Sequence, residues 1–212
     1  MNKYVYSFSE GNKQMKNLLG GKGANLAEMT LIGLPVPSGF TITTEACNQY
    51  FFDGKSINSD IKQQVERAVL QLEKQIDNQF GGSPCLLVSV RSGSVFSMPG
   101  MMDTILNLGL NDENVKELGE RTNSMRFALD CYRRFIQMYS NVVLEVPMYK
   151  FESILEDFKE ENGLKSDQEL DESHLATIIS EYKKVVKAET EEEFEQSPRQ
   201  QLYAAIEAVF KS

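Results

Sequence analysis

The sequence lacks a long apolar segment, a targeting signal and any concentration of positive charge. No run of about 18 apolar residues occurs in its 212 residues, so no helix is predicted to cross a membrane. Residues 1–10 have neither the apolar core of a secretory signal nor the Arg- and Ser-rich character of a transit peptide. Binding to duplex nucleic acid needs several phosphate-neutralising side chains on one face, and no basic stripe is present. We therefore expect neither a membrane nor a nucleic acid as partner.

Cysteine and histidine are scarce, which excludes several kinds of site. Cys47, Cys85 and Cys131 lie far apart and form no Cys-x-x-Cys pair. They are predicted to be reduced, mostly buried thiols of a cytoplasmic protein, with import into an organelle left open. His174 is the only histidine, and no Gly-x-Ser-x-Gly motif accompanies it. The sequence therefore predicts no catalytic triad and no histidine-based metal site, and we expect His174 to be exposed or to pack against a helix.

The acidic residues are concentrated in one part of the chain. Hydrophobic residues make up 41% and charged residues 25% of the chain, which is typical of a globular protein and excludes a disordered chain or a disulfide scaffold. The net charge is −9, but residues 151–195 alone hold 15 acidic residues and 5 lysines. The other 167 residues hold 16 acidic and 17 basic residues and could accept an anionic ligand.

The sequence pattern changes near residue 111. Before it, the predicted strands 41–44 and 86–91 alternate with the predicted helices 25–32 and 59–76, which favours an α/β layer structure. After it the pattern is almost wholly helical, with helices predicted over 125–143, 149–162, 174–186 and 198–210. The last helix has Ser197 at its N-cap and Pro198 at its first position.

The segment Gly20-Gly21-Lys22-Gly23 could bind phosphate. Glycines allow the backbone to approach an anion closely, and a helix N-terminus favours negative charge. Lys22 would add a mobile positive charge. The spacing fits neither a Walker A loop nor a dinucleotide fingerprint, so a tight turn with an exposed lysine is the alternative.

Arg91 ends the predicted strand 86–91 and is followed by Ser92 and Gly93. Ligands of open α/β sheets bind at the ends of strands, and a guanidinium matches phosphate oxygens in a bidentate fashion. An ion pair with a neighbouring carboxylate is the alternative. Farther along, Tyr132, Arg133 and Arg134 lie on a helix with an apolar stripe, where salt bridges are the default expectation.

A third segment, Ser97 to Thr104, reads SMPGMMDT. Gly100 allows close backbone approach, and Ser97 or Thr104 could donate from a hydroxyl group, so the loop could cover a nucleotide. By composition alone its methionines favour core packing, because methionine commonly fills irregular gaps.

Taken together, three stretches resemble the pyruvate, phosphate dikinase family. They are NLLGGKGANLAEMTLIGLPVPSGFTITTEA (17–46), LLVSVRSGSVFSMPGMMDTILNLGLND (86–112) and YRRFIQMYSNVVLEVP (132–147). The string from Met98 to Thr104 is highly specific, whereas Gly-Gly-Lys-Gly is shared with phosphoenolpyruvate synthases and other water dikinases.

The resemblance implies the first lobe of an ATP-grasp-like nucleotide-binding domain, of class α/β (α+β), with an inserted helical subdomain. The expected divisions are 1–111 for the α/β lobe, 112–197 for the helical insertion and 198–212 for a helix returning to the lobe. The chain is then expected to be an inactive, monomeric N-terminal fragment of a longer, homodimeric enzyme. The second lobe, a swivelling phosphohistidine domain and a pyruvate-binding barrel would lie outside it.

The resemblance also implies the chemistry, which is ATP + pyruvate + phosphate = AMP + phosphoenolpyruvate + diphosphate. The histidine that carries the phosphoryl groups and most ligands of Mg²⁺ would lie outside this chain, so no catalytic or metal-binding residue is expected within it. Lys22 and Arg91 are assigned to the ATP phosphates, together with Gly100, Met101, Met102, Asp103 and Thr104. The alternatives are a phosphoenolpyruvate synthase or related water dikinase, and a non-catalytic nucleotide-binding or docking module.

Overall fold

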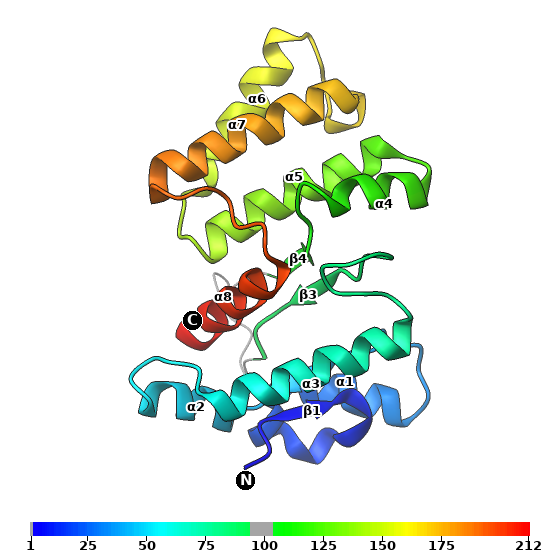
Figure 1. Cartoon of the computed structure of the whole chain (residues 1–212), viewed down its shortest axis with the longest axis vertical. Coiled ribbons are helices and arrows are strands. Elements are labelled where there is room, and N and C mark those ends of the chain that lie inside the picture. Colours follow the sequence, from blue (N-terminus) through cyan, green and yellow to red (C-terminus); the bar gives the residue numbers. More distant parts are fainter. Residues whose placement is uncertain (1, 94–103) are drawn as a thin grey trace. The chain divides into compact units, whose positions relative to one another are not determined.

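The computed structural model describes residues 2–93 and 104–212 and divides the chain into two compact units (Figure 1). Unit 1 consists of the described residues within Met1–Asn78, Arg91–Asp103 and Val209–Ser212. Unit 2 consists of Gln79–Val90 and Thr104–Ala208. The described part of the chain contains no helix that is long and apolar enough to span a bilayer.

Unit 1 combines a two-stranded sheet with three helices. Strand β1 (Val5–Ser7) pairs antiparallel with β2 (Phe40–Ile42), with Tyr6 opposite Thr41. The 3-10 turns Phe8–Glu10 and Lys13–Met15 lead from β1 into the first helix. The helices are α1 (Lys16–Leu31), α2 (Thr44–Phe52) and α3 (Ser59–Ile76).

Helix α3 follows directly from local signals in the sequence. Asn58 caps it by accepting a hydrogen bond from the Ile61 backbone N–H at 3.0 Å, and Asp77 ends it in the left-handed conformation. One turn apart, Ile61, Val65, Val69 and Leu72 are buried along one face. The predicted span 59–76 is confirmed.

Helix α1 is longer than predicted and is interrupted at Gly20. The prediction placed its start at residue 25, but the helix begins at Lys16. Only Gly20 departs from helical geometry, with φ 70° and ψ 170°, and the helix continues from Gly21 to Leu31. The glycine run had indicated a turn because glycine disfavours helices. Packing overrides that preference at Gly23, where a side chain would collide with Thr41 of β2.

Unit 2 contains a second antiparallel strand pair and a group of helices. Strand β3 (Val88–Val90) pairs with β4 (Ile105–Leu108), with Val88 opposite Leu108. The helices are α4 (Asn114–Thr122), α5 (Met125–Val142), α6 (Met148–Glu161), α7 (Glu172–Thr190) and most of α8 (Pro198–Lys211), with a 3-10 turn at Asp167–Glu169. The mixed α/β class is confirmed. The strands form antiparallel pairs, however, whereas the prediction for Arg91 assumed an open α/β sheet with a ligand at the strand ends. Strand pairing depends on tertiary contacts, which the periodicity of the sequence does not show.

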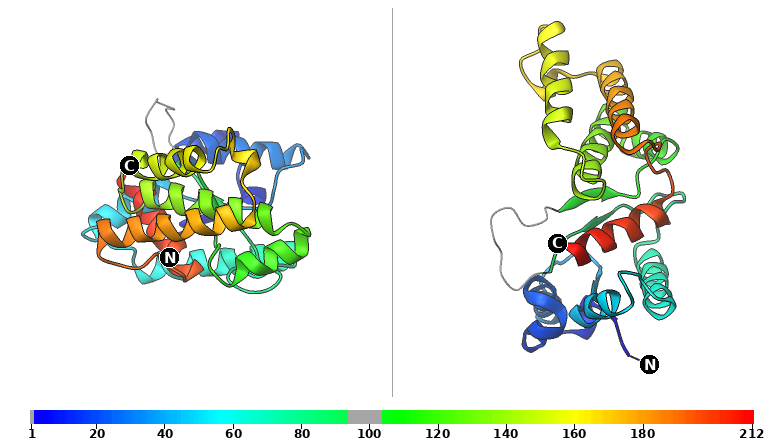
Figure 2. Two further views of the ribbon diagram at one scale, coloured as in Figure 1. Left: turned by 90° about the horizontal axis from the view of Figure 1, so that it is seen from above. Right: turned by 90° about the vertical axis from the view of Figure 1, so that its left-hand side faces the viewer.

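Helix α5 is the centre of unit 2 and packs against α4, α7 and β4. Figure 2 shows α5 and α7 side by side in both of its views. The buried Phe135 and Tyr139 of α5 meet Phe194 with ring centroids 5.8 and 5.6 Å apart, both edge to face. Such aromatic pairs add stability beyond the area they bury.

The boundary between the units differs from the boundary expected near residue 111. The predicted helical segment 112–197 lies wholly within unit 2, but residues 79–90, 104–111 and 198–208 cluster with it. The sequence pattern changes near residue 111 because the last strand ends there. The boundary between the units, however, depends on which helices pack against the strands. The assignment of residues 1–111, 112–197 and 198–212 to a lobe, an insertion and a returning helix stays a prediction.

Gln201 joins three segments of unit 2 and is fully buried. Its amide oxygen accepts a hydrogen bond from the Gly109 N–H at 3.2 Å. Its amide nitrogen donates to the carbonyl oxygens of Leu110 and Glu195, at 3.0 and 2.7 Å. The side chain therefore satisfies backbone groups at the end of β4 and before α8.

We expect Gln201→Leu to lower the free energy of unfolding of unit 2 by about 2–4 kcal/mol, because it leaves three buried backbone groups without a partner. Urea titration followed by circular dichroism measures this change. Gln200→Leu is the matched control, since Gln200 is exposed on the same helix, and it should shift stability by less than about 0.5 kcal/mol. Equal effects of the two substitutions would contradict this role for Gln201.

Candidate anion-binding site in unit 1

The break in α1 brings Gly20 against a distant part of unit 1. A side-chain carbon on Gly20 would lie 2.0 Å from the carbonyl oxygen of Gly93 and 2.9 Å from its carbonyl carbon. From the other direction, a side-chain carbon on Gly93 would lie 3.6 Å from the carbonyl oxygen of Leu19. The backbones of residues 19–20 and 93 are therefore in direct contact, although 73 residues separate Gly20 from Gly93 along the chain.

This contact brings together the two segments that carry the candidate cations. Lys22 is two residues beyond Gly20, in the first turn after α1 resumes, and is partly buried. Arg91 is two residues before Gly93, directly after β3, and is exposed. Two residues of chain span at most about 7 Å, so the backbones of Lys22 and Arg91 both lie near this contact. The positive end of the helix dipole at Gly21 adds to the attraction for an anion.

Neither Lys22 nor Arg91 is paired with a carboxylate within residues 2–93 and 104–212. The ion pair considered as the alternative role for Arg91 is thus absent from the described part of the chain. By contrast, Lys13 of the same unit pairs with Glu28 at 3.6 Å. Two cations without an ion pair in the described part of the chain, beside a glycine-rich turn, are typical of a site for a polyanion.

The turn that carries Lys22 is anchored from both sides. Leu19, Ala24 and Ala27 form a buried cluster in α1. The Thr44 hydroxyl, at the start of α2, donates to the carbonyl oxygens of Asn17 at 2.7 Å and Leu18 at 3.3 Å. These contacts hold the residues on either side of Gly20 in place. The sequence alone did not indicate Thr44 or Gly93 as parts of this site, because their contacts join distant segments.

The remaining candidate residues are in other places. Gly100, Met101, Met102 and Asp103 lie outside the described residues. Thr104 is partly buried, directly precedes β4 and belongs to unit 2. The role expected for 100–104 stays a prediction.

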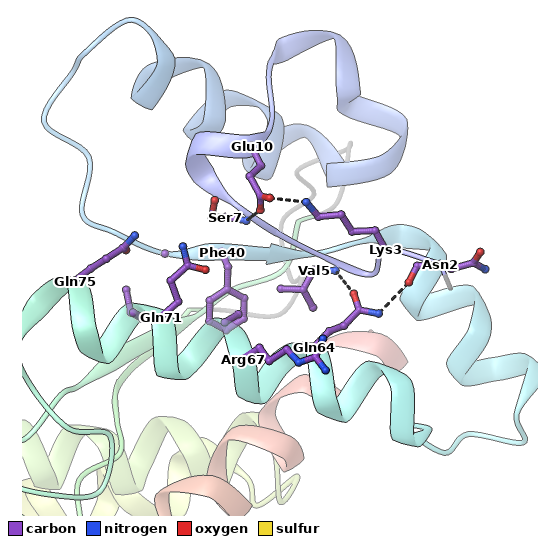
Figure 3. A pocket seen from close by; sticks show the side chains of 13 residues that line it. Asn2, Lys3, Val5, Ser7, Glu10, Phe40, Gln64, Arg67, Gln71 and Gln75 are labelled. Atoms are coloured by element: carbon purple, nitrogen blue, oxygen red, sulfur yellow. Dashed lines mark hydrogen bonds and ion pairs between the residues drawn. The ribbon is translucent and has the colours of Figure 1, made fainter.

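Unit 1 also has a pocket of about 320 Å³ that contains neither Lys22 nor Arg91 (Figure 3). It lies between β1, β2 and α3. Gln64 of α3 accepts hydrogen bonds from the backbone N–H groups of Tyr4 and Val5, at 2.7 and 3.3 Å. Across the pocket, the hydrogen bond from the Lys3 ammonium lowers the pKa of Glu10 below its usual value. The Gln64 contacts fasten the N-terminal strand to α3, and the Lys3–Glu10 pair joins the two ends of that strand.

The cysteines and His174 have structural roles. All three thiols are free, and burial raises the pKa of Cys85 to about 11, far from the range of a reactive thiolate. His174 lies in the first turn of α7, where its backbone N–H donates to Asp171 at 2.9 Å and its ring packs against Phe158. It is partly buried and packs against a helix, as expected. The interpretation of Arg133 and Arg134 as salt-bridge residues is confirmed, since both pair with Asp130.

The fold and these contacts define a mixed α/β protein with a cationic, glycine-lined site. Comparison with known proteins identifies it further. The sequence model of the family described as "Pyruvate phosphate dikinase, AMP/ATP-binding domain" matches residues 16–64 and 54–212. The chain therefore belongs to the pyruvate, phosphate dikinase AMP/ATP-binding domain family.

Individual relatives agree along the whole chain. The chain is 53% identical over 214 residues to pyruvate, phosphate dikinase of Clostridium symbiosum and 48% identical over 217 residues to that of Rhizobium meliloti. Both alignments cover 100% of this chain. Chloroplastic pyruvate, phosphate dikinase 1 of Arabidopsis thaliana is 48% identical over 215 residues, or 99% of the chain. The chain spans 24%, 24% and 22% of the length of these three relatives.

Proposed function

We propose that this chain binds the phosphates of ATP, as part of a longer enzyme that makes phosphoenolpyruvate from pyruvate. The observation that carries the proposal is the contact between Gly20 and Gly93 in a chain of this family, which places the backbones of Lys22 and Arg91 near one another; neither cation has an ion pair within residues 2–93 and 104–212. The overall reaction is ATP + pyruvate + phosphate = AMP + phosphoenolpyruvate + diphosphate.

The two cations suit the charge that this reaction moves. In the proposed sequence, a histidine elsewhere in the enzyme attacks the β-phosphate of ATP, the bond to the α-phosphate breaks and AMP leaves. Inorganic phosphate takes the terminal phosphoryl group to give diphosphate, and the phosphoryl group left on histidine passes to pyruvate. Phosphoryl transfer depends on positioning and on cations directed at the phosphate oxygens. Arg91 would hold two oxygens with its planar fork, and Lys22 would neutralise charge as a compact ammonium.

The Mg²⁺ implied by the family has no ligand set among the described residues. No group of three or more His, Cys, Asp or Glu side chains within 2–93 and 104–212 lies in a position to hold a metal ion. We expect the carboxylate ligands in other parts of the longer enzyme.

The same proposal includes a cytoplasmic location, a homodimer and contact with a swivelling phosphohistidine domain. The three free thiols support the cytoplasmic location.

Isotope labelling of the longer enzyme tests the proposed reaction. With ATP labelled at the γ-phosphate, we expect the label in diphosphate and a complete dependence of phosphoenolpyruvate formation on added phosphate. Label released as inorganic phosphate, without any need for added phosphate, would show a water dikinase instead. An enzyme that binds ATP but forms no AMP would show a nucleotide-binding module.

A further inference from the structure

We propose that Gly20 is a positioning residue for ATP binding. This inference rests on the proposed function. Because Gly20 has no side chain, the 91–93 segment can lie against α1, and this contact sets the separation of Arg91 and Lys22 that a polyphosphate requires. Gly20 touches no phosphate in this proposal. It acts through the position of Arg91.

The backbone of Gly20 can be adopted only by glycine. Its φ of 70° and ψ of 170° lie in a region that is essentially restricted to glycine. Several other glycines also have positive φ, including Gly33 at 79° directly after α1. A positive φ alone therefore does not distinguish Gly20 from Gly33.

Space does distinguish them. A methyl group on Gly20 would lie 2.0, 2.9 and 3.3 Å from the O, C and Cα atoms of Gly93, which are backbone atoms that no rotamer change can move. At Gly33 nothing lies within 4 Å of that position. An alanine at residue 20 must therefore push the 91–93 segment away by roughly 1 Å or more. When a displacement of this size moves a side chain that positions a substrate, the reaction rate can fall about a hundredfold.

The displacement should fall on Arg91 rather than on Lys22. Leu19, next to Gly20, is buried with Ala24, and the Thr44 hydroxyl binds the carbonyl oxygens just before it. The side that carries Lys22 is therefore held by core packing and hydrogen bonds. Arg91 is exposed and has no ion pair among the described residues, although Ser92 next to it is buried, so the displacement should fall on the Arg91 side chain.

The two sides of the contact should respond unequally to the same methyl group. On Gly93 it would lie 3.6 Å from the Leu19 carbonyl oxygen, which is an ordinary van der Waals distance. Gly93→Ala should therefore disturb the contact less than Gly20→Ala does.

The test measures ATP binding and AMP formation in the longer enzyme for wild type, Gly20→Ala and Gly33→Ala. We expect Gly20→Ala to weaken ATP binding roughly tenfold to a hundredfold relative to Gly33→Ala. Thermal melting compares the stabilities of Gly20→Ala and Gly33→Ala, which share the strain of positive φ. Equal ATP affinity in these two variants would overturn the proposal.

A double-mutant cycle separates positioning from a general loss of stability. Arg91→Ala should cost little more in the Gly20→Ala background, because Arg91 is already displaced, whereas Lys22→Ala should keep its full effect there. An undiminished effect of Arg91→Ala in that background would overturn the proposal.

If Gly20→Ala does not fold, Gly93→Val separates the same two backbones from the Gly93 side, and it should weaken ATP binding relative to Gly33→Ala. Unchanged ATP binding by folded Gly93→Val would overturn the proposal. Wild-type enzyme that binds no ATP would overturn the proposed function and this inference with it. Wild-type enzyme that binds ATP, with no effect of Gly20→Ala, would overturn this inference alone.

Discussion

Replacing Lys22 or Arg91 by alanine is expected to slow AMP formation by the longer enzyme about tenfold to a few hundredfold. Each cation would make charge-assisted hydrogen bonds worth about 1.5–3 kcal/mol, and 1.4 kcal/mol corresponds to a factor of ten. The exchange of phosphate between phosphoenolpyruvate and pyruvate does not involve ATP and should be nearly unchanged. Rapid-quench measurement of AMP, set beside isotope exchange between pyruvate and phosphoenolpyruvate, compares the two half-reactions.

The chain offers matched controls for both substitutions. Lys74 and Arg67 are exposed residues of α3 that have no ion pair among the described residues. Lys74→Ala and Arg67→Ala remove the same charges on a helix that takes no part in the contact between Gly20 and Gly93, and we expect each to alter AMP formation by less than about twofold. Equal losses in both half-reactions with the fold intact would reject the assignment of Lys22 and Arg91 to the ATP phosphates.

The second large effect is expected at Arg133, the most deeply buried charged side chain described in unit 2. Its side chain is 3% exposed, and its Nη2 lies 2.8 Å from Asp130 and 3.3 Å from Asp167. The ion pair between Arg133 and Asp167 links α5 to the 3-10 turn Asp167–Glu169, which precedes α7. We expect Arg133→Met to lower the free energy of unfolding by about 1.5–3 kcal/mol, because it removes charge-assisted hydrogen bonds of a buried guanidinium, although Asp130 keeps Arg134 and Asp167 keeps Lys159.

Arg134→Met is the matched control for Arg133→Met. Arg134 pairs with the same Asp130 at 3.0 Å but its side chain is 56% exposed. Exposed pairs contribute little, so this change should cost less than about 1 kcal/mol. Urea titration of both variants measures the difference. A loss at Arg134 as large as that at Arg133 would show that burial does not determine the contribution of these pairs.

The elements that depend on local signals were predicted well. Helix α3 was predicted at Ser59–Ile76 because a capping side chain and an apolar stripe occur within one segment. The start of α8 at Pro198 rested on the same kind of signal. Helices α2 and α4 were not predicted, because each is short and buries few apolar side chains, Ala46 and Tyr50 in the case of α2.

Strand pairing and unit boundaries could not be predicted in the same way. A predicted strand over 41–44 gives no indication that β2 will pair with residues 5–7, because that partner is some 35 residues away. For the same reason, the clustering of β3 and β4 with the helical segment was not predicted. These outcomes depend on which apolar faces meet, which is a property of the folded chain.

The sequence by itself determined the family, the mixed α/β class and the identity of the two candidate cations, because residue types and short motifs are local properties. Only the tertiary structure decided that the backbone of Gly20 meets that of Gly93. That contact depends on the absence of a side chain at Gly20, on a backbone conformation that only glycine adopts, and on the packing that holds Leu19 in place. The last two conditions are local to α1, but the first joins residues that are distant along the chain, and close packing is the physical reason that it applies only in the folded chain.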